Sequence, residues 1–293
     1  MATRSLKDLN QAQLERLAFI EFRLWFLGDV RRPDLIDRFG IAPAVATRDL
    51  ASYRDIAPQN IAFNDSRKVY EPTSSFKPIF DHEPDRVLNA LSRGFGEGIG
   101  RASTGFLACE FPLRLNQPSL PTLAVITRAI HQEKMVRLTY HSLSSGASKR
   151  ELVPFALVDN GWRWHTRAYD RKSNEFRDLV ITRMEKPVLI ENDEIQAHEQ
   201  PDQDNQWTRI VTLELVPHPA QPRAEIVARD FGMKNGSLIL KVRAAIAGYV
   251  LQQWGVDCSA THCLDPNRYR LWLKDPLVLY GVQSAVLASG YNH

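Results

Sequence analysis

The sequence lacks an apolar run long enough to cross a membrane, and residues 1–13 are too polar to form the core of a signal peptide. A transmembrane helix needs about 20 consecutive, mostly apolar residues, and a secretory signal needs an apolar region near its start. We therefore predict a cytoplasmic protein that has no membrane partner.

Cysteine is also scarce. Cys109, Cys258 and Cys263 are odd in number, and no two of them form a Cys-x-x-Cys pair. Disulfide frameworks and zinc sites need cysteines in even numbers or in closely spaced pairs. His262 lies beside Cys263, but a second pair of ligands at zinc-like spacing is missing. We predict reduced thiols and no bound metal.

Signatures of catalysis and of cofactor binding are missing as well. No nucleophile elbow and no paired-carboxylate motif accompanies the histidines and serines. The glycines of residues 94–105 are spaced like a dinucleotide fingerprint, but no hydrophobic strand precedes them and no clear helix follows. We predict no catalytic residues and no cofactor, and hence a protein that is not an enzyme.

The composition is that of a folded protein with several domains. The 293 residues are 44% apolar and 24% charged, which suits two or three domains of roughly 70 to 120 residues. Residues 121–190 hold 12 Lys and Arg against 7 Asp and Glu, whereas residues 191–293 hold 9 against 12. The excess positive charge of the middle segment either attracts an anionic ligand or forms a solvated basic face.

Residues 1–75 carry the pattern of a winged helix-turn-helix. Three apolar helical stripes, separated by glycine-containing turns, precede two short apolar runs that flank a polar turn. The predicted ranges are 14–27, 32–40 and 43–54 for the helices and 60–70 for the hairpin, or wing.

The third helix of such a domain enters the major groove of DNA. Ala46 and Leu50 should face the core, which leaves the opposite face for DNA, and Thr47 and Arg48 are the best candidates for base contacts. Ala42 stands where Ser or Thr would cap this helix, which costs about 1 kcal/mol of helix stability. The full set of predicted DNA-binding residues is Arg31, Arg32, Ala44, Thr47, Arg48, Arg54, Arg67 and Lys68.

A second interpretation of this domain is a scaffold for protein contacts. Residues 1–75 hold 11 Lys and Arg against 10 Asp and Glu, and Asp49 and Asp55 lie beside the arginines of the third helix. A nearly neutral domain attracts DNA only weakly as a monomer.

The rest of the chain divides into three segments. Residues 76–118 are predicted to form a helical connector. Residues 119–195 begin with a helix and continue with five short alternating strands, which predict a small β-barrel. Residues 205–293 alternate strands and helices, which predicts a small α+β domain. The whole is an α+β multidomain protein.

The run Trp162-Arg-Trp164-His165-Thr166-Arg167-Ala-Tyr169-Asp170, followed by Phe176-Arg177 and Ile181-Thr-Arg183, resembles the WYL domain, which implies an Sm-like barrel. Trp164, His165 and Thr166 occupy the three positions that name the family; only the tryptophan is kept, and histidine and threonine replace the tyrosine and leucine. The order of segments resembles the BrxR or CapW group of WYL-domain repressors found beside bacterial anti-phage systems. This resemblance implies a homodimer, joined in part by its C-terminal domain, that binds an inverted-repeat operator and represses phage-defence genes. It also implies control by an anionic effector such as a nucleotide or single-stranded nucleic acid.

Aromatic, hydroxyl and guanidinium groups in the middle segment suit such an effector, because guanidinium forks bind phosphate bidentately. The alternative is that some of these arginines pair with Asp159, Asp170, Glu175 and Asp178 as ordinary surface ion pairs. A nucleic-acid-processing enzyme or accessory factor also remains a hypothesis. The predicted ligand-binding residues are Tyr140, Ser142, Arg150, Trp164, His165, Arg167, Arg177 and Arg183.

Overall fold

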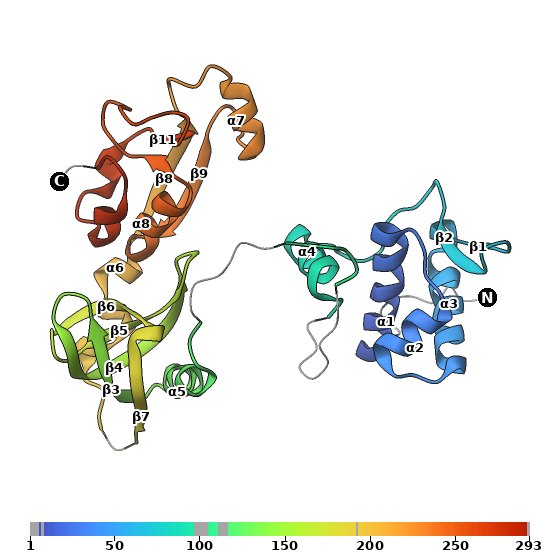
Figure 1. Cartoon of the computed structure of the whole chain (residues 1–293), viewed down its shortest axis with the longest axis horizontal. Coiled ribbons are helices and arrows are strands. Elements are labelled where there is room, and N and C mark those ends of the chain that lie inside the picture. The colour runs from blue at the N-terminus through green and yellow to red at the C-terminus, as the bar shows by residue number, and fades with distance from the viewer. Residues whose placement is uncertain (1–5, 7–8, 97–104, 111–116, 192, 292–293) are drawn as a thin grey trace. The chain divides into compact units, whose positions relative to one another are not determined.

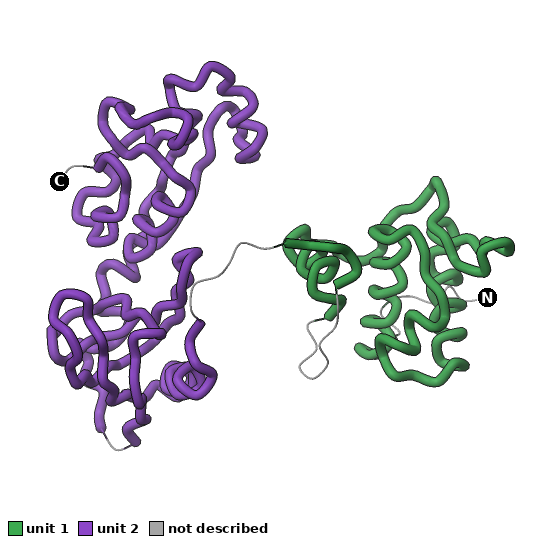
Figure 2. The backbone as a smooth tube through the Cα atoms, viewed as in Figure 1, with its two compact units in different colours: residues 1–112 green, residues 113–293 purple. Residues whose placement is uncertain are grey.

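The computed structural model describes residues 6, 9–96, 105–110, 117–191 and 193–291. The chain divides into two compact units, residues 1–112 and 113–293 (Figure 2). None of the helices within the described ranges is both long enough and apolar enough to cross a bilayer.

The first unit begins with the predicted winged helix-turn-helix (Figure 1). Gly28 and Gly40 adopt positive φ angles of 83° and 64° at the ends of the first two helical segments, a conformation that glycine adopts without strain. The predicted helices and hairpin are confirmed within a few residues. The elements are α1 (Gln11–Phe22, continued by the π-helical turn Arg23–Leu27), α2 (Arg32–Phe39), α3 (Pro43–Ile56), β1 (Ile61–Asn64) and β2 (Val69–Pro72).

The segment after the wing packs onto the same hydrophobic core. Phe76 and Phe80 contact this core, and Phe95, which follows α4 (Pro84–Arg93), meets Phe19 of α1 edge to face with ring centroids 5.1 Å apart. Residues 76–96 are therefore part of the first compact unit and not a free linker.

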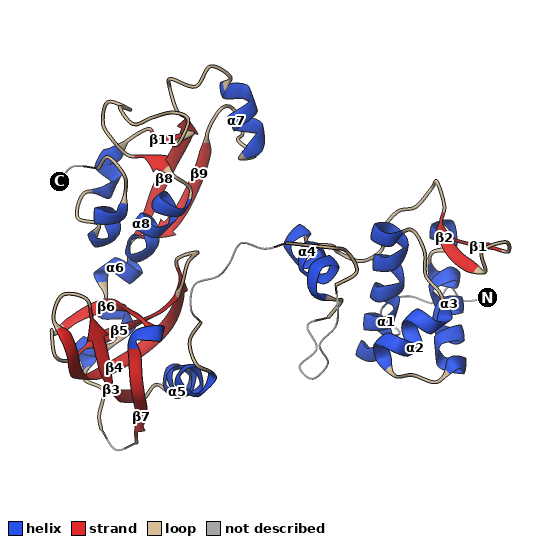
Figure 3. Ribbon diagram, viewed as in Figure 1, coloured by secondary structure: helices blue, strands red, loops and turns tan. Residues whose placement is uncertain are grey.

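The second unit starts with α5 (Leu120–His131), which packs against a five-stranded antiparallel sheet of order β6-β5-β4-β3-β7 (Figure 3). The pairing register shifts once in β3, between Arg137 and Thr139, and once in β4, between Pro154 and Ala156. Shifts of this kind, as in β-bulges, bend a sheet. The predicted strands are confirmed. The closed Sm-like barrel is not confirmed, because no pairing joins β6 to β7 among the described residues, and a 3-10 turn, Ile181–Arg183, connects them. The strands are β3 (Met135–Ser142), β4 (Gly146–Asp159), β5 (Trp164–Asp170), β6 (Glu175–Val180) and β7 (Met184–Ile190).

The C-terminal part is a four-stranded sheet of order β10-β11-β8-β9 with helices packed on one face. The core joins Leu213 and Leu215 of β8 to Ala247 and Leu251 of α8. Two-residue β10 was not predicted, because two residues are too few to show alternation. The elements are α6 (Asn205–Thr208), β8 (Ile210–Pro217), α7 (Ala224–Asp230), β9 (Leu238–Arg243), α8 (Ala244–Gln253), β10 (Val256–Asp257) and β11 (Leu271–Leu273).

Candidate nucleic-acid interface and ligand-binding domain

Helix α3 has one buried face and one free face, as its apolar spacing predicts. Ala46 and Leu50 are buried in the core of the first unit. On the other side Ala44, Thr47 and Arg48 are exposed. Thr47 donates its hydroxyl to the carbonyl of Pro43, and the helix begins at Ala42 without a side-chain cap. The free face therefore presents a short side chain and a guanidinium at the same end of the helix.

The carboxylate of Asp49 does not lie on this free face. It is buried and forms an ion pair with Arg16 of α1, with 2.5 Å between Arg16 Nε and the carboxylate, and it also accepts a hydrogen bond from Gln13. Its charge is therefore neutralised against α1. One of the two carboxylates that favoured a protein scaffold is thus removed from the helix surface.

Four of the predicted phosphate-binding and base-reading arginines are exposed and make no side-chain ion pair with any described residue. They are Arg31, Arg32, Arg48 and Arg54. Free guanidinium groups on α2 and α3 retain their full capacity to bind phosphate.

The two cations of the wing are partly engaged. Arg67 forms ion pairs with Glu71 and, at 3.4 Å, with Asp29. Lys68 lies 3.4 Å from Asp65. Both residues belong to the turn between β1 and β2, where Lys68 has a φ of 54°, so their predicted place on the returning strand is wrong. The polar segment Asn64–Ser66 is followed by two further turn residues before pairing resumes.

A buried polar network ties α3 to the connector. The Tyr53 hydroxyl donates to Glu21 of α1 at 2.7 Å, and Glu21 also accepts the backbone N–H groups of Ile79 and Phe80. His82 lies 3.0 Å from the same carboxylate. Burial, together with the Glu21 carboxylate, raises the pKa of Tyr53 far above its usual value, which keeps the hydroxyl a donor. Glu21 of α1 therefore links the connector to α3, the helix that is predicted to contact DNA.

The eight predicted ligand-binding residues do not gather into one pocket. The Tyr140 hydroxyl is buried and accepts the Val180 N–H at 3.2 Å. Ser142 is half-buried and lies 3.1 Å from the Ser144 hydroxyl. Arg150 is 9% exposed and pairs with buried Asp170. Tyr140 and Arg150 thus have partners within the sheet, and Ser142 has its partner in the turn between β3 and β4.

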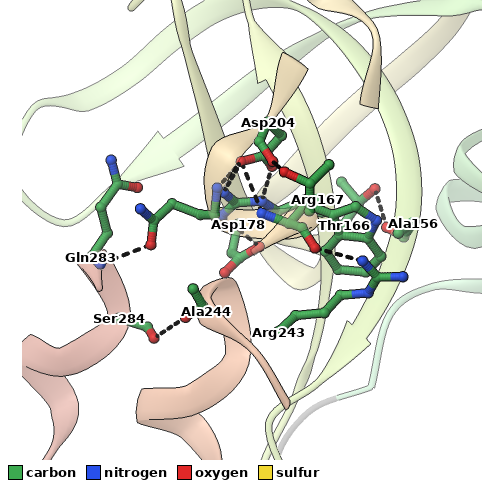
Figure 4. A network of polar contacts seen from close by, with 12 residues as sticks. Ala156, Thr166, Arg167, Asp178, Asp204, Arg243, Ala244, Gln283 and Ser284 are labelled. Atoms are coloured by element: carbon green, nitrogen blue, oxygen red, sulfur yellow. Dashed lines mark hydrogen bonds and ion pairs between the residues drawn. The ribbon is translucent and has the colours of Figure 1, made fainter. Parts of the chain in front are cut away.

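Arg167 lies where the five-stranded sheet of β3–β7 meets the C-terminal part of the second unit (Figure 4). Its guanidinium makes two hydrogen bonds to Asp204, of 2.8 and 3.1 Å, and a third of 3.3 Å to Asp178. Burial lowers the pKa of Arg167, but its hydrogen bonds to these two carboxylates and their negative charges outweigh this effect and raise the pKa overall. The group is permanently charged and is already held by two anions.

His165 shares its face of β5 with Arg167, as the alternation predicts. Its ring stacks on Tyr249 of α8 with ring centroids 5.5 Å apart, and its buried Nδ1 has no hydrogen-bond partner among the residues that the structure describes. Burial lowers its pKa, so the ring is neutral at neutral pH. Tyr249 in turn donates its hydroxyl to Asp178 at 3.1 Å.

The remaining three candidates lie apart from this joint network. Trp164 is 39% exposed. Arg177 pairs with Glu175 at 2.8 Å on the surface of β6. Arg183 is half-buried at the end of the 3-10 turn. Of the surface bridges that the sequence left open as an alternative, only Arg177–Glu175 is exposed. Arg150 and Arg167 do pair with acidic residues, but these pairs are buried, and Arg167 binds mainly Asp204, which the alternative did not include.

Asp204 and Tyr249 were not among the residues predicted from the sequence to form the site. Asp204 caps α6 by accepting the backbone N–H groups of Gln206 and Trp207 while it binds Arg167. An aspartate directly before a short polar helix is a recognisable capping signal. Nothing in the sequence indicates that the same carboxylate meets an arginine 37 residues earlier.

Three family models match the chain in the order of these parts. The BrxR transcriptional regulator winged helix-turn-helix domain matches residues 12–93, the WYL domain residues 121–189, and the BrxR transcriptional regulator C-terminal dimerization domain residues 210–279.

Curated relatives match over nearly the whole chain. The DNA-binding transcriptional repressor CapW of Escherichia coli (strain KTE188) is 31% identical over 92% of this chain and 91% of its own. CapW of Pseudomonas aeruginosa is 33% identical over 84% of this chain and 83% of its own, and CapW of Stenotrophomonas maltophilia is 31% identical over 89% of each. The chain therefore belongs to the BrxR/CapW family of WYL-domain transcriptional regulators.

Proposed function

We propose that this protein is a homodimeric repressor that binds an inverted-repeat operator with two copies of α3. The observation that carries the proposal is the free face of α3, where Thr47 and Arg48 are exposed opposite a buried core face. In this fold the second helix of the helix-turn-helix pair contacts base edges, and two-fold symmetry of the protein is mirrored in the operator.

The remaining cations support phosphate contacts around this face. Arg31, Arg32 and Arg54 are free of acidic partners among the described residues, whereas Arg67 and Lys68 must exchange weak surface ion pairs for phosphates. Exposed pairs of this kind are worth about 1 kcal/mol or less, so the exchange costs little.

The family resemblance adds two further parts to the proposal. Dimer formation is assigned to residues 210–279, which match the C-terminal dimerization domain. Control by an anionic effector is assigned to the WYL domain, and the regulated genes are proposed to be phage-defence genes next to its own. An effector of this kind must bind one arrangement of the dimer better than the other.

The experiment is a gel-shift titration against the DNA upstream of the protein's own gene, with random duplex as competitor and at two salt concentrations. We expect a preference for an inverted repeat that Arg48→Ala reduces markedly. Lys186→Ala, which removes an exposed cation of the WYL domain, should leave the preference intact. Equal and strongly salt-dependent binding to both duplexes would reduce the activity to phosphate contact without sequence recognition. No binding at either salt would favour the scaffold.

A further inference from the structure

A basic cavity of about 300 Å³ lies at one end of the WYL sheet, away from the residues that the family motif singles out. It is lined by five cations and a single carboxylate, namely Arg137, Lys149, Arg150, Arg171, Lys172 and Glu151. Of these, only Arg150 was among the residues expected to bind ligand. We propose that this cavity binds a phosphate group of the anionic effector, a proposal that rests on the proposed effector control and locates its site.

The strand register builds the cavity. Arg137 of β3 is directly opposite Glu151 of β4. Lys149 lies two residues before Glu151 in β4 and therefore on the same face. The turn after β5 closes the other side, because the backbone N–H of Arg171 donates to the Glu151 carbonyl at 3.1 Å. Cations from two strands and one turn thus surround one space.

The acidic partners leave part of this charge unmatched. Glu151 pairs with Arg137 at 2.9 Å, and the carboxylates that hold Arg150 and Arg171 are outside the lining. The ammonium groups of Lys149 and Lys172 are exposed and have no hydrogen bond or ion pair within the described ranges. The two lysines therefore provide free donors for a phosphate, whereas each of the three guanidinium groups already has an acidic partner.

Arg171 connects the cavity to the segment that leads into the C-terminal part. It binds Glu199 through both Nε and Nη2, at 2.5 and 2.8 Å, and Asp193 at 3.1 Å. Although burial opposes it, the bonds from Arg171 hold the pKa of Glu199 below its usual value, so the pair stays ionised. A phosphate in the cavity competes with these carboxylates for the guanidinium.

The test measures binding of a short fluorescein-labelled oligothymidylate to the full-length protein by anisotropy, with ATP and inorganic pyrophosphate as competitors. Lys149→Ala/Lys172→Ala is compared with Lys134→Ala/Lys186→Ala, which removes the same charge from lysines already paired with Glu191 and Glu185. We expect the first double variant to weaken binding about tenfold or more and to lower the salt slope by about 0.7 for each lost phosphate contact. The second should bind like the wild type.

The competitors and a third variant separate the outcomes. Competition by ATP or pyrophosphate assigns the cavity to a nucleotide or a free phosphate, and its absence assigns it to a single strand. Equal losses in both double variants, or a loss confined to Arg177→Ala/Arg183→Ala, would overturn the location. If the wild-type protein binds its operator but none of the probes, the phosphate site in the cavity is overturned and the proposed repressor function stands. If it binds the probes but shows no preference for an operator, the phosphate site stands and the repressor function is overturned.

Discussion

Replacing either of the two carboxylates that bind Arg167 by an amide should change the free energy of unfolding by different amounts. Asp204 makes two hydrogen bonds to the guanidinium and caps α6, whereas Asp178 makes one long hydrogen bond of 3.3 Å to it. One buried cation faces two carboxylates, so the cluster has one negative charge in excess. Asp204→Asn breaks the better pair, and Asp178→Asn removes the excess.

The expected magnitudes follow from this geometry. Asp204 and Arg167 are 2% and 4% exposed. Loss of a buried, charge-assisted pair costs about 3–5 kcal/mol, and an asparagine that keeps the cap and one acceptor should recover part of it. We expect Asp204→Asn to lower the free energy of unfolding by about 2–4 kcal/mol. Asp178→Asn should change it by about 1 kcal/mol or less, because the charge it removes is the unbalanced one.

The pH dependence gives an independent check. Burial raises the pKa of Asp178 above its usual value of 3.8, although Arg167 opposes the shift. A carboxyl whose folded pKa exceeds its unfolded pKa binds more protons in the folded state, so its contribution to stability grows as the pH falls from the raised pKa toward 3.8. The stability of the wild type relative to Asp178→Asn should therefore increase as the pH falls toward 3.8.

The assay is urea unfolding followed by circular dichroism at several pH values, with the free energy taken by linear extrapolation. Losses of equal size in the two variants, or a larger loss in Asp178→Asn, would refute the assignment of Asp204 as the principal partner of Arg167. A pH-independent difference between wild type and Asp178→Asn would refute the raised pKa.

Three other predictions concern separate parts of the chain. Arg48→Ala should weaken operator binding about 10- to 100-fold and random-duplex binding less, measured by gel shift, since a base contact is worth about 1–3 kcal/mol; equal loss on both duplexes would contradict a base contact. Tyr53→Phe removes a buried donor to Glu21 at 2.7 Å and should lower the stability of the first unit by about 1–3 kcal/mol in thermal unfolding; an unchanged Tm would show that the bond contributes nothing. Gly248→Ala should destabilise the C-terminal part by about 3 kcal/mol or more, because its Cβ would lie 1.8 Å from the Ser284 carbonyl oxygen; native unfolding behaviour would mean that the two segments separate easily.

Periodicity made much of the fold predictable. The apolar stripe of α3 placed Ala46 and Leu50 inside and Arg48 outside, and the structure agrees. Alternation likewise placed His165 and Arg167 on one face of β5. These are local properties, because the 3.6- and 2-residue repeats determine which side chains share a face.

The partners that each face meets in the folded protein were not predictable from periodicity. The face of β5 that carries Arg167 meets Asp204 and α8 and not solvent, since the sheet and the C-terminal part pack together there. The excess of Lys and Arg in residues 121–190 was evident from the composition. The sequence did not show that Glu199 and Asp204, which lie after this segment, neutralise two of its arginines. Ion pairs between distant residues depend on tertiary packing, which a single sequence does not display.

The segment between β7 and α6 is held at two points by ion pairs to β5 and the turn that follows it. Arg171 binds Glu199 in the middle of the segment, and Arg167 binds Asp204 directly before α6. Well-packed apolar residues would stabilise such a joint as well as or better than buried ion pairs do, so stability alone does not explain the choice. Ion pairs differ from apolar contacts in that an anion can compete for the arginine. A joint built in this way therefore has a physical means of responding to a phosphate bound beside Arg171, which an apolar joint would lack.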